Sequence, residues 1–307
     1  MTPLRLATRM SPMAIAQSQQ VATAISARAG RTVELVGMST YGDASAAQLA
    51  QIGGTGVFVT GVRAALLDGT ADLAVHSLKD LPTGLADGIV LAAIPARDDP
   101  RDALIAPHGA SLSQLPPGAR IGTGSPRRAA QLLMLRSDLV PVAVRGNAGT
   151  RLDRVRPGDL DAVVLAYAGL IRIGRERDAS EVFAPSRLLP APGQGALAVE
   201  CPAGRPDLAA LLACVDDPDS RAATVAERSL LVALEAGCLA PIGAHAVAGP
   251  GGLVLDAIVA APDGSTALRA RIRGACHEAE QVGRTAADDL IGRGAGRIAA
   301  AAGLLVG

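Results

Sequence analysis

The chain has 307 residues, 49% of them hydrophobic, which is enough to build the cores of two or three domains of ordinary size. Basic and acidic residues number 29 each, and this zero net charge argues against a general nucleic-acid binder. Two phenylalanines, two tyrosines and no tryptophan make base stacking an unpromising main activity. No apolar run reaches the ~20 residues of a membrane helix, and the N-terminus lacks the apolar core of a signal peptide. We therefore expect a cytoplasmic protein with neither nucleic acid nor membrane as a partner.

The first part of the chain alternates predicted strands with predicted helices. Strands are expected at residues 4–7, 32–38, 71–76 and 89–94, and helices from Pro12 to about Ala27 and at 62–67. Ser11 suits the N-cap of the first helix, and Pro12 suits its first turn. This alternation is typical of an α/β domain with a largely parallel sheet.

The same pattern starts again near residue 119. A strand at 119–122 runs through Thr123-Gly124-Ser125-Pro126 into a helix. The string Ser-Pro-x-x-x-Ala-Gln occurs at residues 11–17 and again at 125–131, and residues 72–75 resemble residues 161–164. We interpret this as two similar α/β domains, although alanine-rich sequence also produces short matches by chance.

The last third of the chain has a different pattern. A strand at 196–200 could return to the first domain, and a helix at 221–235 follows. Strands at 244–247, 253–260 and 267–272 then precede a helix at 286–301. The predicted fold is therefore α/β, with two doubly wound, periplasmic-binding-protein-like domains and a smaller C-terminal α+β domain. The expected boundaries are 1–96 with 196–216, 101–190, and 220–307.

Arginines gather where predicted strands run into helices. Arg9 and the pair Arg127-Arg128 lie at such junctions, Arg145 ends an apolar strand, and Arg151 follows it closely. In open α/β sheets ligands bind beyond the carboxyl ends of strands, where guanidinium forks can hold carboxylates or phosphates. Each arginine alone could be a solvated surface residue or pair with a nearby aspartate. Together they indicate a ligand with several negative groups.

Lys79 is the only lysine, so every other basic residue is an arginine. Codon bias explains the excess of arginine but not the one lysine that persists, and an ammonium is not equivalent to a guanidinium at a tight site. Asp80 follows it at the end of an apolar strand. It could act as an acid or base or stabilise a developing cation, or it could form a local pair or turn.

Cysteine and histidine show no metal-ligand spacing, so no metal site is expected. Cys238 stands out from Cys201, Cys214 and Cys276, because small and turn-forming residues surround it just past a predicted helix. Such a loop could expose the sulfur for covalent attachment. The alternative is a packed thiol, the usual state of a buried free cysteine.

Together these segments resemble the porphobilinogen deaminase (hydroxymethylbilane synthase) family, in that family's order and over nearly the whole chain. The matching segments are residues 6–12, the glycine-rich loop 53–59, 72–82 (DLAVHSLKDLP), 97–102 (RDDPRD), 121–128, 145–152, 189–196 and 227–243. Thr55 and Thr60 depart from the family, which often has lysines there, and we assign them no binding role.

The resemblance implies a transferase that condenses four porphobilinogen molecules head to tail, releases ammonia and yields the linear tetrapyrrole hydroxymethylbilane. It implies a dipyrromethane cofactor bonded to Cys238 through a thioether, and a monomer. Asp80 and Lys79 correspond to catalytic positions. The aspartate suits the chemistry, because loss of ammonia leaves a methylene-pyrrolenine cation that a carboxylate can stabilise.

The resemblance also assigns binding residues. Those for the cofactor are Thr123, Ser125, Arg127, Arg128, Arg145 and Gly146. Those for the substrate are Arg9, Ser11, Arg151, Arg172 and Gln194. Each pyrrole carries two carboxylates, so a growing chain needs many cationic contacts.

Two other classes of protein fit part of this pattern. A two-lobed solute-binding protein would also place arginines between similar α/β lobes, but the third domain, the missing export signal and Cys238 argue against it. A regulatory ligand-sensing domain is the second alternative, and no helix-turn-helix segment supports it.

Overall fold

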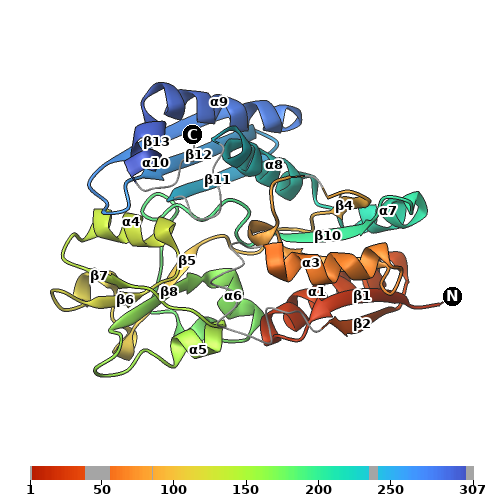
Figure 1. Ribbon diagram of the computed structural model, residues 1–307, viewed down its shortest axis with the longest axis horizontal. Helices are drawn as coiled ribbons and strands as arrows, with labels where there is room; N and C mark the ends of the chain where they lie inside the picture. Colours follow the sequence, from red (N-terminus) through yellow and green to blue (C-terminus); the bar gives the residue numbers. More distant parts are fainter. Residues whose placement is uncertain (1, 39–55, 85, 235–240, 302–307) are drawn as a thin grey trace. The chain divides into compact units, whose positions relative to one another are not determined.

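The computed structural model describes residues 2–38, 56–84, 86–234 and 241–301 (Figure 1). The chain divides into two units, Met1–Arg97 with Ala196–Arg221 and Asp98–Gly195 with Ala222–Gly307. It therefore passes from one unit to the other after Arg97, after Gly195 and after Arg221.

Unit 1 is built on a sheet with the strand order β2-β1-β3-β10-β4. Its strands are β1 (Leu4–Arg9), β2 (Val33–Met38), β3 (Leu73–Ser77), β4 (Ile89–Ala93) and β10 (Leu197–Pro202). β1 pairs parallel with β2 and β3, whereas β10 runs antiparallel to its neighbours β3 and β4. The strands predicted in this region are confirmed, including the return of residues 196–200 to the first sheet.

Helices cover both faces of this sheet. They are α1 (Pro12–Ala29), α3 (Gly56–Leu67) and α7 (Pro206–Leu212), with the short 3-10 turns η2 (Leu78–Asp80) and η6 (Ala213–Val215). Successive residues of a strand point to opposite faces. Accordingly Leu6 packs in the core that contains Ile25 of α1, and Ala7 packs with Val62 of α3. The N-cap prediction is confirmed, because the Ser11 hydroxyl accepts a hydrogen bond from the backbone of α1.

Unit 2 contains a sheet of the same construction, with the order β7-β6-β8-β5-β9. Its strands are β5 (Asp102–Ile105), β6 (Arg120–Gly122), β7 (Val140–Val142), β8 (Ala162–Ala166) and β9 (Glu181–Val182). β6 pairs parallel with β7 and β8, and β5 runs antiparallel to β8 and β9. This order matches that of unit 1 strand for strand, with β5 in the place of β10.

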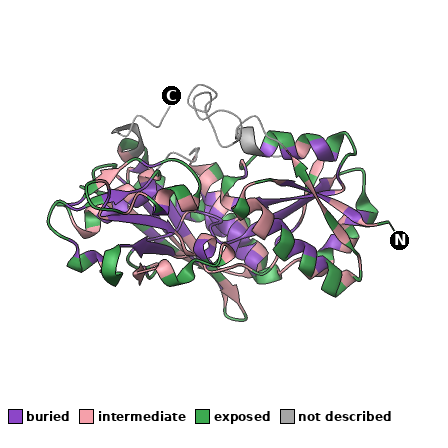
Figure 2. Cartoon of the chain, turned by 90° about the horizontal axis from the view of Figure 1, so that it is seen from below, coloured by how far each residue is buried: buried purple, intermediate pink, exposed green. Residues whose placement is uncertain are grey.

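The helices of this sheet are α4 (Pro126–Leu135), α5 (Ala148–Leu152) and α6 (Tyr167–Arg172), with the 3-10 turns η3 (Pro107–Gly109), η4 (Leu112–Gln114) and η5 (Glu176–Asp178). Leu132 of α4 packs on one face with Ile121, and Leu170 of α6 packs on the other with Val163. Within this sheet, burial is most continuous along β5 and β8, and Figure 2 shows the buried residues of the chain in purple. The prediction of two similar, doubly wound α/β folds is confirmed.

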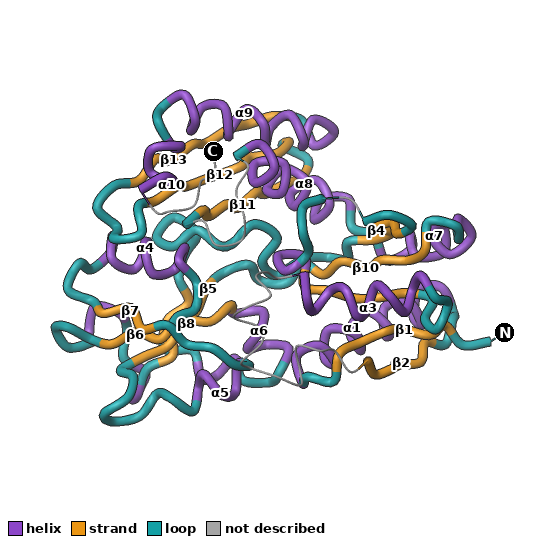
Figure 3. Tube along the Cα trace, in the orientation of Figure 1, coloured by secondary structure: helices purple, strands orange, loops and turns teal. Residues whose placement is uncertain are grey.

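The C-terminal part adds an antiparallel sheet, β11-β12-β13. Its elements are α8 (Pro218–Ala233), β11 (Ile242–Gly249), β12 (Gly252–Ala260), β13 (Ala267–Gly274), the 3-10 turn η7 (Cys276–Glu278), α9 (Ala279–Gly292) and α10 (Ala295–Ala301) (Figure 3). Leu230 of α8 and Ala286 of α9 share a core with Leu255 of the sheet, which confirms the predicted α+β part. Its separation from residues 101–190 as a third domain stays a prediction.

The single final helix predicted for residues 286–301 is wrong. α9 begins earlier, at Ala279, and α10 follows after a break at Gly294, whose φ of 97° is left-handed and ends regular helix. None of the described helices is long and apolar enough to cross a bilayer.

Close packing of α9 on α8 depends on one glycine. A Cβ at Gly283 would lie 2.3 Å from the carbonyl oxygen of Ala226 and 2.7 Å from Cβ of Ser229. We expect Gly283→Ala to lower the stability by about 1–3 kcal/mol, because the helices must separate. Urea unfolding measures this change. Gly292→Ala is the control, since nothing lies within 4 Å of a Cβ there. Equal stability of the two variants would contradict the packing argument.

Candidate active site

One group of the predicted residues meets at the carboxyl edge of the sheet in unit 1. β1 ends at Arg9, and Ser11 then caps α1. The neighbouring parallel strand β3 ends at Ser77 and continues into η2, which holds Lys79 and Asp80. Parallel neighbours bring their carboxyl ends to the same edge, so these segments lie together. Lys79 is half-buried and Asp80 is exposed, which leaves the carboxylate accessible to a ligand.

A buried ionic cluster stabilises β3, the strand that leads to Lys79 and Asp80. Glu200 of β10 accepts two hydrogen bonds from Arg63 of α3, from Nε to Oε2 at 2.9 Å and from Nη2 to Oε1 at 2.6 Å. His76 Nε2 of β3 lies 3.2 Å from Oε2, the oxygen that Arg63 Nε also contacts. Burial alone would raise the pKa of Glu200, but the guanidinium and the imidazole outweigh it and lower that pKa to about 2. The carboxylate therefore remains charged and ties three elements together.

A second group lies at the carboxyl edge of the sheet in unit 2. Thr123 follows β6, and its hydroxyl accepts a hydrogen bond from the backbone of Ser125, which in turn caps α4. Arg145 and Gly146 follow β7, where Arg145 is exposed and Gly146 has a φ of 102°. Arg151 of α5 donates to the Gly146 carbonyl at 2.8 Å. The loop after β7 is thereby closed onto the helix that follows it.

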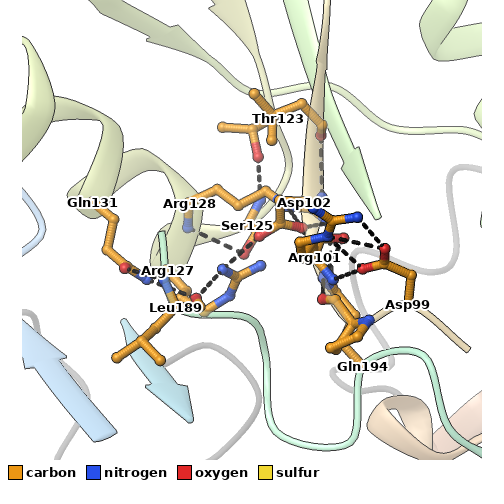
Figure 4. A network of polar contacts seen from close by, with 12 residues as sticks. Asp99, Arg101, Asp102, Thr123, Ser125, Arg127, Arg128, Gln131, Leu189 and Gln194 are labelled. Atoms are coloured by element: carbon orange, nitrogen blue, oxygen red, sulfur yellow. Dashed lines mark hydrogen bonds and ion pairs between the residues drawn. The ribbon is translucent and has the colours of Figure 1, made fainter. Parts of the chain in front are cut away.

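The first turn of α4 carries two buried guanidinium groups that converge on Asp102, as Figure 4 shows. Arg128 Nη2 lies 2.7 Å from Asp102 Oδ1, and Arg127 Nη1 lies 2.7 Å from Oδ2. Asp102 is fully buried at the start of β5. Burial alone would raise its pKa, but the two positive charges hold that pKa well below the usual range, so the group is ionised.

Gln194 and Arg172 extend this network along the loop before β10. Gln194 Nε2 donates to Asp102 Oδ1 at 2.8 Å and to the Pro100 carbonyl at 2.7 Å. Arg172, at the end of α6, donates to Asp98 Oδ2 at 2.9 Å and to the Gly195 carbonyl at 2.7 Å. Both predicted substrate-binding side chains therefore also hold the backbone where the chain enters and leaves unit 2.

The predicted site residues thus fall into two described groups, one on each unit. Cys238, the predicted attachment point, and Thr55 lie outside the described residues. Asp102 was not among the predicted site residues, although it lies in the segment 97–102 that carried part of the resemblance. Its signal in the sequence is a carboxylate at the start of an apolar run, which gives no hint of its partners. Within the described ranges, no group of three or more His, Cys, Asp or Glu side chains is arranged to hold a metal ion.

Comparisons with known proteins agree over most of the chain. A family model described as "Porphobilinogen deaminase, dipyromethane cofactor binding domain" matches residues 4–210, and one described as "Porphobilinogen deaminase, C-terminal domain" matches residues 222–292. The chain is 54% identical to the porphobilinogen deaminase of Thermobifida fusca, over 97% of this chain and 96% of that protein. It is 52% identical to porphobilinogen deaminase 1 of Streptomyces coelicolor, over 95% and 96%.

Solved structures give a weaker similarity. A nutrient binding protein from Burkholderia cenocepacia bound to methionine is 15% identical, with 71% of this chain and 93% of that chain covered and a TM-score of 0.45. A score at this level supports no inference about this chain.

The ionic cluster in unit 1 predicts a specific dependence of stability on pH. Because the pKa of Glu200 is lower in the folded than in the unfolded chain, its contribution is fully present above about pH 4.5 and is lost as the pH falls toward 2. We expect Glu200→Gln to unfold at lower urea than the wild type near pH 7, and this gap to close as the pH falls from 4.5 to 2. The exposed Glu34→Gln serves as the control and should leave the pH profile unchanged. A constant gap would show that Glu200 does not stabilise through its charge.

Proposed function

The chain belongs to the porphobilinogen deaminase family, and on this premise we propose how its own residues divide the work of that enzyme. It is a transferase of tetrapyrrole biosynthesis, which condenses porphobilinogen into hydroxymethylbilane and uses a dipyrromethane cofactor. The observation that carries this conclusion is the match of both family models, in order, across residues 4–210 and 222–292. These matches favour the enzyme over the two alternatives, a solute-binding protein and a ligand-sensing domain.

The residues at the start of α4 suit a group that carries carboxylates. Among the residues that the structure describes, the buried Nε of Arg127 has no hydrogen-bond partner. Two guanidinium groups also face the single carboxylate of Asp102 within this described cluster. A buried donor without a partner is costly, so an added carboxylate would satisfy both hydrogen bonding and charge. We assign this place to the dipyrromethane cofactor, together with Thr123, Ser125 and the loop at Arg145 and Gly146.

When bound, dipyrromethane supplies the pyrrole terminus to which each new substrate unit is joined. Its attachment through a thioether to Cys238 is part of the proposal. In the sequence, the segment 235–240 follows α8 and precedes β11, and both of these elements contribute side chains to the described core of the C-terminal part.

Asp80 is proposed to act on the incoming porphobilinogen. Loss of ammonia from this substrate leaves a cation conjugated with the pyrrole nitrogen, and an exposed carboxylate at the edge of the sheet can stabilise that charge and accept the proton released later. The Lys79 ammonium beside it can hold a substrate carboxylate as a compact positive charge. The cluster of Glu200 and His76 keeps the end of β3 in place behind them.

The remaining arginines are proposed to bind the substrate and the growing chain. Arg9 and Ser11 lie at the same edge as Asp80, while Arg151 lies at the edge in unit 2. Each porphobilinogen brings an acetate and a propionate side chain, and guanidinium groups bind such carboxylates through paired hydrogen bonds. Arg172 and Gln194 are assigned to the same ligand as residues that also hold the loop before β10.

We further propose that the enzyme works as a monomer in the cytoplasm and has no nucleic-acid partner. The thiols of Cys201, Cys214 and Cys276 are free, which fits a reducing compartment. The zero net charge gives no electrostatic basis for binding a polyanion.

The attachment site is tested by Cys238→Ser. We expect the variant to lack the added mass of dipyrromethane, to give no colour with Ehrlich's reagent and to have no activity, because the thioether cannot form. Cys276→Ser is the matched control, since that thiol is half-buried in the C-terminal part and should leave the cofactor in place. A fully active Cys238→Ser protein would refute the assignment.

The role of Asp80 is tested by Asp80→Asn, which keeps the shape of the side chain and removes its charge. We expect cofactor loading to remain and kcat for porphobilinogen consumption to fall by about 100- to 10,000-fold, the usual contribution of a positioned acid or base. The exposed Asp87→Asn is the control and should turn over normally. Near-normal kcat in Asp80→Asn would remove this residue from the mechanism.

A further inference from the structure

The adjacent arginines at the start of α4 differ in how their donors are used. Arg128 donates through Nε and Nη2 to Asp102 Oδ1, at 3.0 and 2.7 Å, and through Nη1 to the Val164 carbonyl at 3.1 Å. Arg127 uses only Nη1, which contacts Asp102 Oδ2 and the Leu189 carbonyl. Its Nε is buried and finds no hydrogen-bond partner in the described part of the chain. The Nε, Nη1 and Nη2 atoms of Arg128 therefore all donate hydrogen bonds within the protein, whereas the Nε of Arg127 remains available to a ligand.

The charges of this cluster do not cancel. Asp102, Arg127 and Arg128 are 0%, 3% and 5% exposed, so solvent screens them little. Burial lowers the pKa of Arg127, the charge of Asp102 opposes that effect and the charge of Arg128 adds to it. Arginine nevertheless stays protonated in proteins. The described cluster thus holds one positive charge in excess, and an anion placed against Arg127 would balance it.

Arg128 cannot take over this role without loss. To turn toward a ligand it would have to release Asp102 Oδ1, and breaking a buried ion pair leaves an uncompensated charge, which is strongly unfavourable. Gln194 reinforces the existing arrangement, because its Nε2 donates to the same oxygen at 2.8 Å and its Oε1 lies 3.4 Å from Arg128 Nη2.

We propose that Asp102 is a positioning residue that holds Arg128 as a brace and leaves Arg127 to bind one carboxylate of the bound pyrrole chain. This deepens the proposed function and rests on it. Asp102 thereby determines that the ligand carboxylate lies at Arg127. It also limits the cluster to one ligand carboxylate, because a second would make the net charge of the cluster negative.

The test changes the net charge of the cluster by substitution in the full-length protein. Cofactor occupancy is measured as the fraction of protein whose intact mass includes dipyrromethane. Arg127→Gln and Arg128→Gln each reduce the cluster to zero net charge, and we expect each to lower occupancy about tenfold or more, because the excess positive charge that attracts the ligand carboxylate is gone. Adding Asp102→Asn to Arg128→Gln restores the excess charge on Arg127, so occupancy should recover. Adding Asp102→Asn to Arg127→Gln leaves the excess charge on Arg128, whose hydrogen bonds to the Val164 carbonyl and to the side-chain oxygen at position 102 still hold it in place, so occupancy should not recover.

The outcomes separate the alternatives. A merely structural role for Asp102 predicts that each double variant loads less than its parent, and that result would overturn the proposal. Equal recovery in both double variants would overturn the division between the arginines. If the wild type itself carried no added mass, the proposed function would fail instead.

A second pair of variants guards against misfolding. If circular dichroism shows that either double variant does not fold, Arg127→Lys and Arg128→Lys keep every charge and decide the question. Lysine cannot reproduce the guanidinium fork. We expect Arg127→Lys to lose occupancy about tenfold more than Arg128→Lys, whose main effect should be a lower melting temperature. The reverse order would overturn the proposal.

Discussion

The buried carboxylate of Asp102 is the constraint on which the arrangement at the carboxyl edge of the sheet in unit 2 depends. It joins the start of β5, the first turn of α4 and the loop that carries Gln194, three segments far apart in the sequence. Burying two guanidinium groups in the first turn of α4 is costly, and this charge offsets part of that cost. The N-terminus of α4 is thereby held at a fixed place above the sheet, with its cationic side chains already oriented before any ligand arrives, which lowers the entropic cost of binding.

The two α/β sheets use one construction to deliver the candidate site. In each, a strand runs into a serine-capped helix, Ser11 for α1 and Ser125 for α4, and the predicted site residues follow the ends of the parallel strands. The cap matters because it fixes the start of the helix, so that arginines placed beside it point from a defined position. Repeating this arrangement supplies many cationic groups, which a ligand with two carboxylates per ring requires.

Local patterns predicted most of this architecture, because caps, apolar strands and strand-helix alternation are visible in short windows. Arg9, Lys79 and Asp80 could be placed at a sheet edge for the same reason. The partners of Asp102 could not be predicted, since its contacts with Arg128 and Gln194 span 26 and 92 residues and leave no local signal. β5 was missed because four buried residues are too short a run to distinguish from a loop. The end of α9 was missed because a glycine in an alanine-rich helix does not always break it.

The antiparallel strands β10 and β5 hold the same place in the two sheets, and each carries a buried carboxylate paired with basic groups. Their positions relative to the carboxyl edge of the sheet differ. Glu200 pairs in register with Ala74, near the start of β3, whereas Asp102 pairs with Ala166, at the end of β8. Glu200 is therefore set back from the carboxyl edge of its sheet. Its bidentate pairing with Arg63 matches its charge. Asp102 stands at the corresponding edge of its own sheet with one more cation than it can neutralise, and only at the edge can such an excess be met by a ligand.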